Sequence, residues 1–117
     1  MKKPQILAIL LLLALAVADA ALLGGWRPID AEDLKDPDVI DAAKFAVKQH
    51  NQKEGEKLKL VRVESGSYQV VRGKNYKLEL TVSGAADTNG LSKYEAIVWV
   101  QPGAGSPKKL TSFKKVP

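Results

Sequence analysis

The 117-residue sequence contains no cysteine and a single histidine. Without cysteine the chain can form no disulfide, and it offers no thiolate for nucleophilic or metal chemistry. Aromatic residues are also scarce, at 6% of the chain. A small core without disulfides must therefore be held by side-chain packing and by the hydrogen bonds of a sheet.

Catalytic patterns are missing as well. The only histidine, His50, falls on the apolar face of an expected helix, where a structural role is more common than general-base catalysis. Its neighbour Asn51 has no cysteine with which to form a Cys-His-Asn arrangement, and residues 65–67 lack the pattern of a nucleophile elbow. The carboxylates of residues 30–33 stand in a segment that looks solvated. No metal-ligand spacing or glycine-rich phosphate loop occurs, so we expect no enzyme, no cofactor and no metal.

The net charge of +5 is spread along the chain rather than gathered in a dense Lys/Arg block. Nucleic-acid and membrane-surface binding favour clustered charge. We therefore expect no nucleic-acid partner and interpret the charge as a solubility feature. A secreted basic module that binds polyanions stays open as an alternative, and it predicts an affinity that falls steeply with salt.

The first 20 residues have the pattern of a secretory signal peptide. Residues 1–3 are basic, residues 6–17 form an uninterrupted apolar run, and Ala18-Asp19-Ala20 fits the small-x-small cleavage pattern. The apolar run is too short to span a bilayer comfortably. We expect cleavage after Ala20 and a single mature domain over residues 21–117, without membrane contact. The secretory pathway then delivers the protein to the extracellular space or the vacuole.

One helix is predicted after Asp36. Asp36 suits the N-cap, Pro37 suits the first helical position, and apolar residues then recur at helical spacing until residues 51–55 end the helix. Phe45 projects away from the apolar face. We expect the N-terminal segment to cover it.

Strand-like runs follow the helix at residues 58–64, 74–83, 94–101 and 110–116. In the first run, the alternation of apolar and polar residues is broken between Leu60 and Val61, which predicts a bulge or burial on both faces. Polar stretches with glycine predict loops at residues 84–90 and 102–107. The pattern indicates an α+β fold, with one long helix packed across an antiparallel β-sheet of four to five strands.

Between the first two runs lies Gln69-Val70-Val71-Arg72-Gly73. A short connection that contains glycine predicts a β-hairpin, but hairpin tips are usually polar and this one carries adjacent valines. Val70 and Val71 either continue a strand into the core or form an exposed apolar tip that enters a partner's groove. The pattern leaves both interpretations open.

Two further segments are unusual in their glycine and proline content. Gly24-Gly25 stands near the expected new N-terminus, either as a loose tail or as a segment that lies flat against a partner's backbone, where a Cβ would clash. Trp26 and Ile29 mark the point at which the chain joins the folded body. The loop over residues 102–107 would lie with the other two segments at one end of the sheet.

With these segments in place, the chain resembles the plant cystatins over essentially the whole mature sequence. Residues 69–73 match the family's Q-x-V-x-G, residues 24–29 are similar to its N-terminal glycine segment, and residues 42–51 are similar to the helix signature of plant members. The resemblance implies a reversible, tight-binding inhibitor of papain-like cysteine proteases with a role in plant defence. We expect a monomer, with a domain-swapped dimer as the alternative that a strained hairpin allows.

The resemblance also implies how the inhibitor binds. Three segments form a wedge that occludes the active-site cleft of the protease. The residues that it assigns to protease binding are Gly24, Gly25, Gln69, Val70, Val71, Arg72, Gly73, Pro102 and Gly103.

The second loop departs from the family pattern. Gly103 stands where the family has tryptophan, and residues 104–107 make the loop slightly longer than usual. Because a tryptophan anchor can dominate the energy of an interface, we expect weaker inhibition than in typical members, above all against proteases with a partly obstructed cleft. The departure favours one alternative, a non-inhibitory protein on the same fold.

Overall fold

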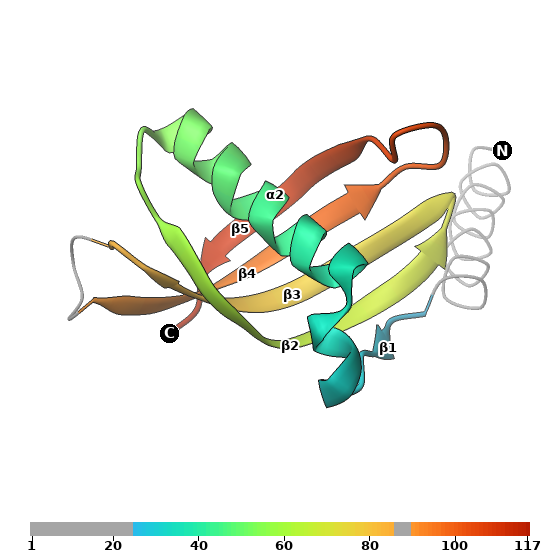
Figure 1. The fold of residues 1–117 in the computed structure, drawn as a ribbon, viewed down its shortest axis with the longest axis horizontal. Coiled ribbons are helices and arrows are strands. Elements are labelled where there is room, and N and C mark those ends of the chain that lie inside the picture. The colour runs from blue at the N-terminus through green and yellow to red at the C-terminus, as the bar shows by residue number, and fades with distance from the viewer. Residues whose placement is uncertain (1–24, 86–89) are drawn as a thin grey trace, which may run out of the picture.

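The computed structural model describes residues 25–85 and 90–117 and shows one long helix laid across an antiparallel sheet (Figure 1). The sheet has five strands in the order β1-β2-β3-β4-β5, and each neighbouring pair is antiparallel. The predicted α+β architecture is confirmed. The predicted signal peptide of residues 1–20 lies outside the described residues.

The elements in chain order are β1 (Arg27–Pro28), the 3-10 helix η1 (Ala31–Lys35), α2 (Pro37–Glu54), β2 (Lys59–Val71), β3 (Gly73–Ser83), β4 (Leu91–Val100) and β5 (Lys108–Lys115). β4 and β5 each begin earlier than the sequence predicted. β1 was not predicted, because a two-residue strand has no alternation to detect. Within the described residues, no helix combines the length and the apolar character needed to cross a membrane.

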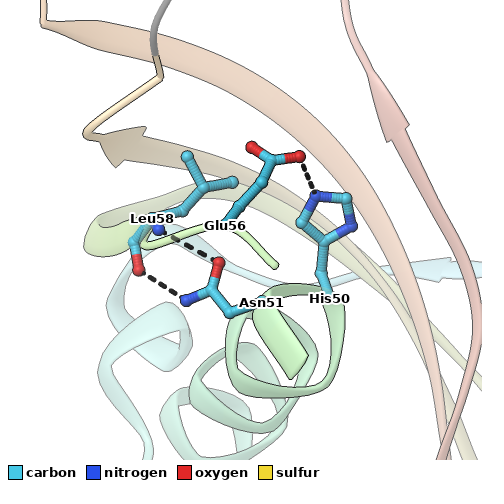
Figure 2. A network of polar contacts seen from close by, with 4 residues as sticks. All are labelled: His50, Asn51, Glu56 and Leu58. Carbon is cyan, nitrogen blue, oxygen red and sulfur yellow. Dashed lines mark hydrogen bonds and ion pairs between the residues drawn. The ribbon is translucent and has the colours of Figure 1, made fainter. Parts of the chain in front are cut away.

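α2 begins and ends where the local signals place it. Asp36 occupies the N-cap position without a side-chain capping hydrogen bond, and Pro37 is the first helical residue. Gly55 ends the helix in a left-handed conformation with φ of 68°. Asn51 then ties the helix to the start of β2. Its Nδ2 donates to the Leu58 carbonyl at 2.9 Å, and its Oδ1 accepts from the Leu58 N–H at 3.0 Å (Figure 2).

The core lies between the inner face of α2 and the sheet. Three alanines of the helix, Ala42, Ala43 and Ala46, are fully buried, so the helix can lie close to the strands. The buried apolar side chains of the sheet are Tyr76, Leu78, Leu80, Val82, Tyr94, Ala96 and Val98. Burying one Leu or Val side chain contributes about 1.5–3 kcal/mol, so this layer can hold the fold without a disulfide.

Phe45 and His50 lie on the β5 side of α2. Phe45 is half-buried and lines a groove together with Leu110 and Phe113. The expectation that the N-terminal segment covers Phe45 is wrong, because that segment pairs with β2, toward the other edge of the sheet. The His50 ring stacks on Phe113 with centroids 4.1 Å apart, and its Nε2 lies 3.1 Å from Glu56 Oε1 (Figure 2). These contacts give His50 the structural role that its position predicted.

β2 is irregular where the alternation of apolar and polar residues is broken. Its pairing with β3 shifts between Leu60 and Arg62, which confirms the predicted bulge, and Val61 is 45% exposed there. A second shift, between Val63 and Ser65, was not predicted.

Glu64 lies within this second shift and turns toward the neighbouring strand. The Thr81 hydroxyl donates to Glu64 Oε1 at 2.7 Å, and Arg62 Nε contacts the same oxygen. The hydrogen bond from Thr81, followed by that from Arg62, lowers the pKa of the Glu64 carboxyl. The charged form of Glu64 is therefore stabilised in place at the bulge.

Candidate functional site

Three segments gather at one end of the sheet, as the sequence predicted. They are the β1 region (residues 25–28), the turn between β2 and β3 (residues 70–73) and the loop between β4 and β5 (residues 101–107), and together they form the loop edge (Figure 1). Strand pairing fixes this arrangement, because antiparallel neighbours in chain order return their alternate turns to the same end. Gly24 lies outside the described residues, whereas Gly25 is described and exposed.

The tip of the β2–β3 hairpin is apolar and open to solvent. β2 continues as far as Val71, but the Val70 and Val71 side chains are 55% and 40% exposed. The interpretation that these valines enter the core is therefore wrong. Adjacent exposed valines at the end of a rigid hairpin form a small apolar surface suited to contact with a partner.

Gly73 sets how closely this hairpin lies against the second loop. Its φ is 85°, and a Cβ at this position would come within 2.2 Å of the Val100 carbonyl oxygen and 3.0 Å of Pro102 Cδ. A side chain is excluded both by the backbone conformation and by the neighbouring backbone. The turn and the base of the second loop are therefore in direct contact.

Trp99 adds a second link between these segments. Its indole Nε1 donates to the Arg72 carbonyl at 2.7 Å, across 27 positions in sequence. Alternation along β4 places Trp99 on the face of the sheet opposite the buried Val98, but alternation assigns the indole no partner. The alternation was the available signal, and nothing local indicated the bond.

The second loop is compact and carries small side chains. The Gln101 N–H donates to the Pro107 carbonyl at 2.8 Å, which closes the loop, and the Ser106 N–H donates to the Gly103 carbonyl at 3.2 Å. Gly103 has φ of 118°, a conformation that suits glycine. Pro102 and Gly103 thus lie on the loop edge as expected, but they present little apolar area to a partner.

The N-terminal segment is fixed along β2. The Ile29 N–H donates to the Gly66 carbonyl at 2.9 Å, next to the pairing of β1 with residues 67–68. Gly66 has no room for a side chain, because a Cβ would come within 2.7 Å of Leu78 Cδ2 and 3.2 Å of Ile29 Cδ1. Trp26 lies beneath Lys77, whose Nζ is 4.4 Å from the ring centroid. The described part of this segment is therefore held in place beside the hairpin.

Gln69 lies one step behind the tip. Its Oε1 accepts a long hydrogen bond from Asn75 Nδ2, at 3.4 Å, and the residue is half-buried. The structure therefore brings Gln69 to the base of the hairpin rather than to its apolar end.

Charged and phenolic groups lie beside the loop edge. Burial raises the pKa of Tyr76, and the negative charges of Asp38 and Asp36 raise it further. The Lys74 Nζ lies 4.9 Å from the Tyr68 ring centroid and 5.6 Å from that of Tyr76, so this cation is drawn back over the rings. In the described part of the chain, no cluster of His, Asp or Glu side chains could hold a metal ion. The loop edge thus combines an exposed apolar tip with a lysine that lies over aromatic rings.

Several known proteins similar to this chain are proteinase inhibitors. Residues 31–116 match a family model described as aspartic acid proteinase inhibitor. Cysteine proteinase inhibitor 1 of Actinidia chinensis is 44% identical over 80% of this chain and 75% of its own length. Cysteine proteinase inhibitor 5 of Arabidopsis thaliana is 41% identical over 91% of this chain and 83% of its own length.

The fold has relatives among solved structures. The salivary cystatin of the soft tick Ornithodoros moubata has a TM-score of 0.65 at 22% identity, over 80% of this chain and 98% of the tick protein. Dimeric human cystatin F has a TM-score of 0.61 at 18% identity, over 80% of this chain and 86% of the human one. At this level of identity the likeness concerns the fold.

Proposed function

The chain belongs to the plant cystatin family, and from this membership we propose that it is a reversible inhibitor of papain-like cysteine proteases. The family's inhibitors are not enzymes, in agreement with the catalytic patterns missing from the sequence. The single observation that carries the proposal is the exposed pair Val70 and Val71. The turn that carries this pair contains Gly73, whose backbone lies directly against the base of the second loop.

The mechanism we propose is occlusion of the protease cleft by the loop edge. Val70 and Val71 would contact apolar walls beside the catalytic cysteine, while the N-terminal glycine segment and the second loop would lie on either side. Inhibitors of this kind bury about 800 Å² per partner. A wedge held by Gly73 and the pairing of its strands loses little conformational entropy on binding, which favours affinity. It also offers the protease no scissile carbonyl in a productive position.

The second loop should contribute less than the hairpin. Residues 103–106 carry small or no side chains, so they bury little area and provide no aromatic anchor. We expect inhibition that depends mainly on the hairpin and is weakest against proteases whose cleft is partly obstructed.

The test is a titration of papain with recombinant residues 21–117. We expect stoichiometric, reversible inhibition by the unmodified chain. In the double variant Val70→Asp/Val71→Asp, two carboxylates would have to enter an apolar cleft, so the inhibition constant should rise by about a hundredfold or more.

The matched control is Val61→Asp. Val61 is likewise exposed on β2, at 45%, but it lies at the bulge rather than at the loop edge. We expect this variant to inhibit within about threefold of the unmodified chain, as surface substitutions usually have small effects. A folded protein that leaves papain fully active at micromolar concentration would exclude the proposed function.

The family match over residues 31–116 favours a second candidate, inhibition of an aspartic proteinase. The same titration run against pepsin distinguishes the two functions. Inhibition of pepsin that survives Val70→Asp/Val71→Asp would place an aspartic-proteinase site elsewhere on the molecule. Loss of both inhibitory activities in that variant would assign both to the hairpin.

The proposal includes export of the protein and removal of residues 1–20, supported by the basic, apolar and small-residue pattern of that stretch. An exported inhibitor would meet proteases of the extracellular space or the vacuole, which suits a role in defence. Expression of the full chain in plant cells, followed by mass measurement, should give a protein that starts at Ala21.

Size-exclusion chromatography of the same material should give a monomer, and a dimer would indicate domain swapping.

A further inference from the structure

We propose that Trp99 is a positioning residue that holds the hairpin tip in its binding conformation, and that this hold compensates in part for the small second loop. The inference rests on the proposed function and adds a residue outside the three segments that contact a protease. It is carried by the hydrogen bond from Trp99 Nε1 to the Arg72 carbonyl, at 2.7 Å.

Arg72 is the residue of the tip that the strands themselves hold least. Val71 pairs with Gly73 at the end of the β2–β3 ladder, so Arg72 lies at the turn between the paired residues. Its carbonyl is fixed by the Trp99 indole, and the backbone of Gly73 rests against the Val100 carbonyl. Arg72 is therefore bonded to Trp99, and Gly73 lies close to the next residue of β4.

The Trp99 side chain lies outside the core, on the face of the sheet from which it can reach the turn. Val98 and Val100 alternate with it along β4, and Val98 is fully buried on the helix side, so the indole stands on the outer face of the sheet. There it pairs with Asn75, which in turn pairs with Gln69. The three side chains form a row across the base of the hairpin, directly behind the tip.

A fixed tip matters more in this chain than in one with a bulky second loop. If only a fraction of the free molecules have the tip in the binding conformation, the apparent affinity falls by that fraction. Val70 and Val71 make most of the apolar contact in the proposed function, so their orientation governs affinity. Without an aromatic anchor at Gly103, little else would offset a mobile tip.

The experiment compares Trp99→Phe with Thr111→Val. Trp99→Phe removes the indole N–H and keeps an aromatic ring on the outer face. Thr111→Val removes a bond of the same kind from the neighbouring strand, because Thr111 Oγ1 donates to the Ile97 carbonyl at 3.1 Å, away from the loop edge. Incorporation of 3-benzothienylalanine at position 99 removes only the N–H and keeps the indole shape, so it serves if the phenylalanine variant folds poorly.

Two quantities are measured. The inhibition constant for papain should rise by about fivefold to tenfold in Trp99→Phe and in the benzothienyl protein, the loss expected for one hydrogen bond. Amide hydrogen exchange at residues 71–73 of the free inhibitor should be faster in both proteins. Thr111→Val should change neither quantity.

Unchanged inhibition together with unchanged exchange in the benzothienyl protein would overturn the proposal. Equal effects of Thr111→Val and Trp99→Phe would also overturn it, because the loss would then reflect general stability. If the unmodified chain leaves papain active, the proposed function fails, and the exchange rates still decide whether Trp99 holds the tip.

Discussion

At the residue scale, Asn51 shows how this chain secures a junction without a disulfide. Its side chain both donates to and accepts from the backbone of Leu58, so a single amide closes the turn between α2 and β2. The geometry resembles one rung of a β-ladder made by a side chain. The consequence is that the helix and the first long strand share one local anchor.

We expect replacement of Asn51 to destabilise the folded protein. We expect Asn51→Ala to lower the free energy of unfolding by about 1–3 kcal/mol, because two part-buried backbone groups of Leu58 lose their partner. Urea unfolding monitored by circular dichroism measures the change. The control is Gln52→Ala at the next, exposed position. Alanine favours the helix at both positions, so helix propensity predicts no loss, and an equal loss in both variants would contradict the role of Asn51.

Gly73 permits a second test at this scale. Gly73→Ala introduces a positive-φ strain and a clash with the Val100 carbonyl, whereas Gly55→Ala introduces the strain alone, because nothing lies within 4 Å of a Cβ there. Left-handed strain costs about 1–2 kcal/mol. We therefore expect Gly55→Ala to lose roughly that amount and Gly73→Ala to lose more, as measured by chemical unfolding. Papain inhibition should weaken only in Gly73→Ala, because Gly55 lies far from the loop edge.

At the element scale, β3 carries a tyrosine, Tyr76, that should link stability to alkaline pH. The pKa of Tyr76 is raised in the folded state, mainly by burial, so the folded protein holds this proton more tightly than the unfolded chain. The stabilisation is present in full below the ordinary tyrosine pKa of about 10 and is lost as pH rises through the folded-state value.

We expect the free energy of unfolding to fall as the pH rises above about 10, and to fall less steeply in Tyr76→Phe. Urea unfolding of both proteins from about pH 9 upward compares chains that differ only in the hydroxyl at position 76. Parallel curves for the two proteins would contradict the assignment.

The elements also differ in how far sequence alone could predict them. The bounds of α2 follow from Pro37 and Gly55, whose backbone preferences act within one turn. β1 and the bulge after Val63 depend on pairing between distant residues, and no local pattern records that pairing. Phe45 was predicted to project away from the apolar face, but it packs against the core beside β5, a strand that follows much later in the chain.

The candidate site divides in the same way. The apolar tip was visible as two valines in a place that favours polar residues, and its exposure resolved which interpretation holds. The bond between Trp99 and Arg72 was not visible, because it joins β4 to the β2–β3 turn, and these segments meet only in the folded sheet.

At the scale of the whole molecule, binding through charge and binding through apolar contact predict opposite effects of salt on affinity. The net charge of +5 is distributed, and the proposed contact is apolar at its tip. We expect the inhibition constant for papain to change by less than about threefold when NaCl is raised from about 0.1 to 0.5 M, because salt screens charges and not apolar burial. A fall in affinity of several orders of magnitude would instead support a polyanion-binding module.

The two ends of the sheet also differ in how a group attached there would affect the loop edge. The described N-terminal residues belong to the loop edge, whereas Pro117 lies at the other end, where the Val116 N–H donates to the Lys93 carbonyl (Figure 1). A reporter or a resin coupled through Pro117 would leave the loop edge unobstructed, and the same group coupled at Gly25 would crowd it. If the loop edge binds proteases as proposed, attachment through Pro117 therefore suits affinity capture of those proteases.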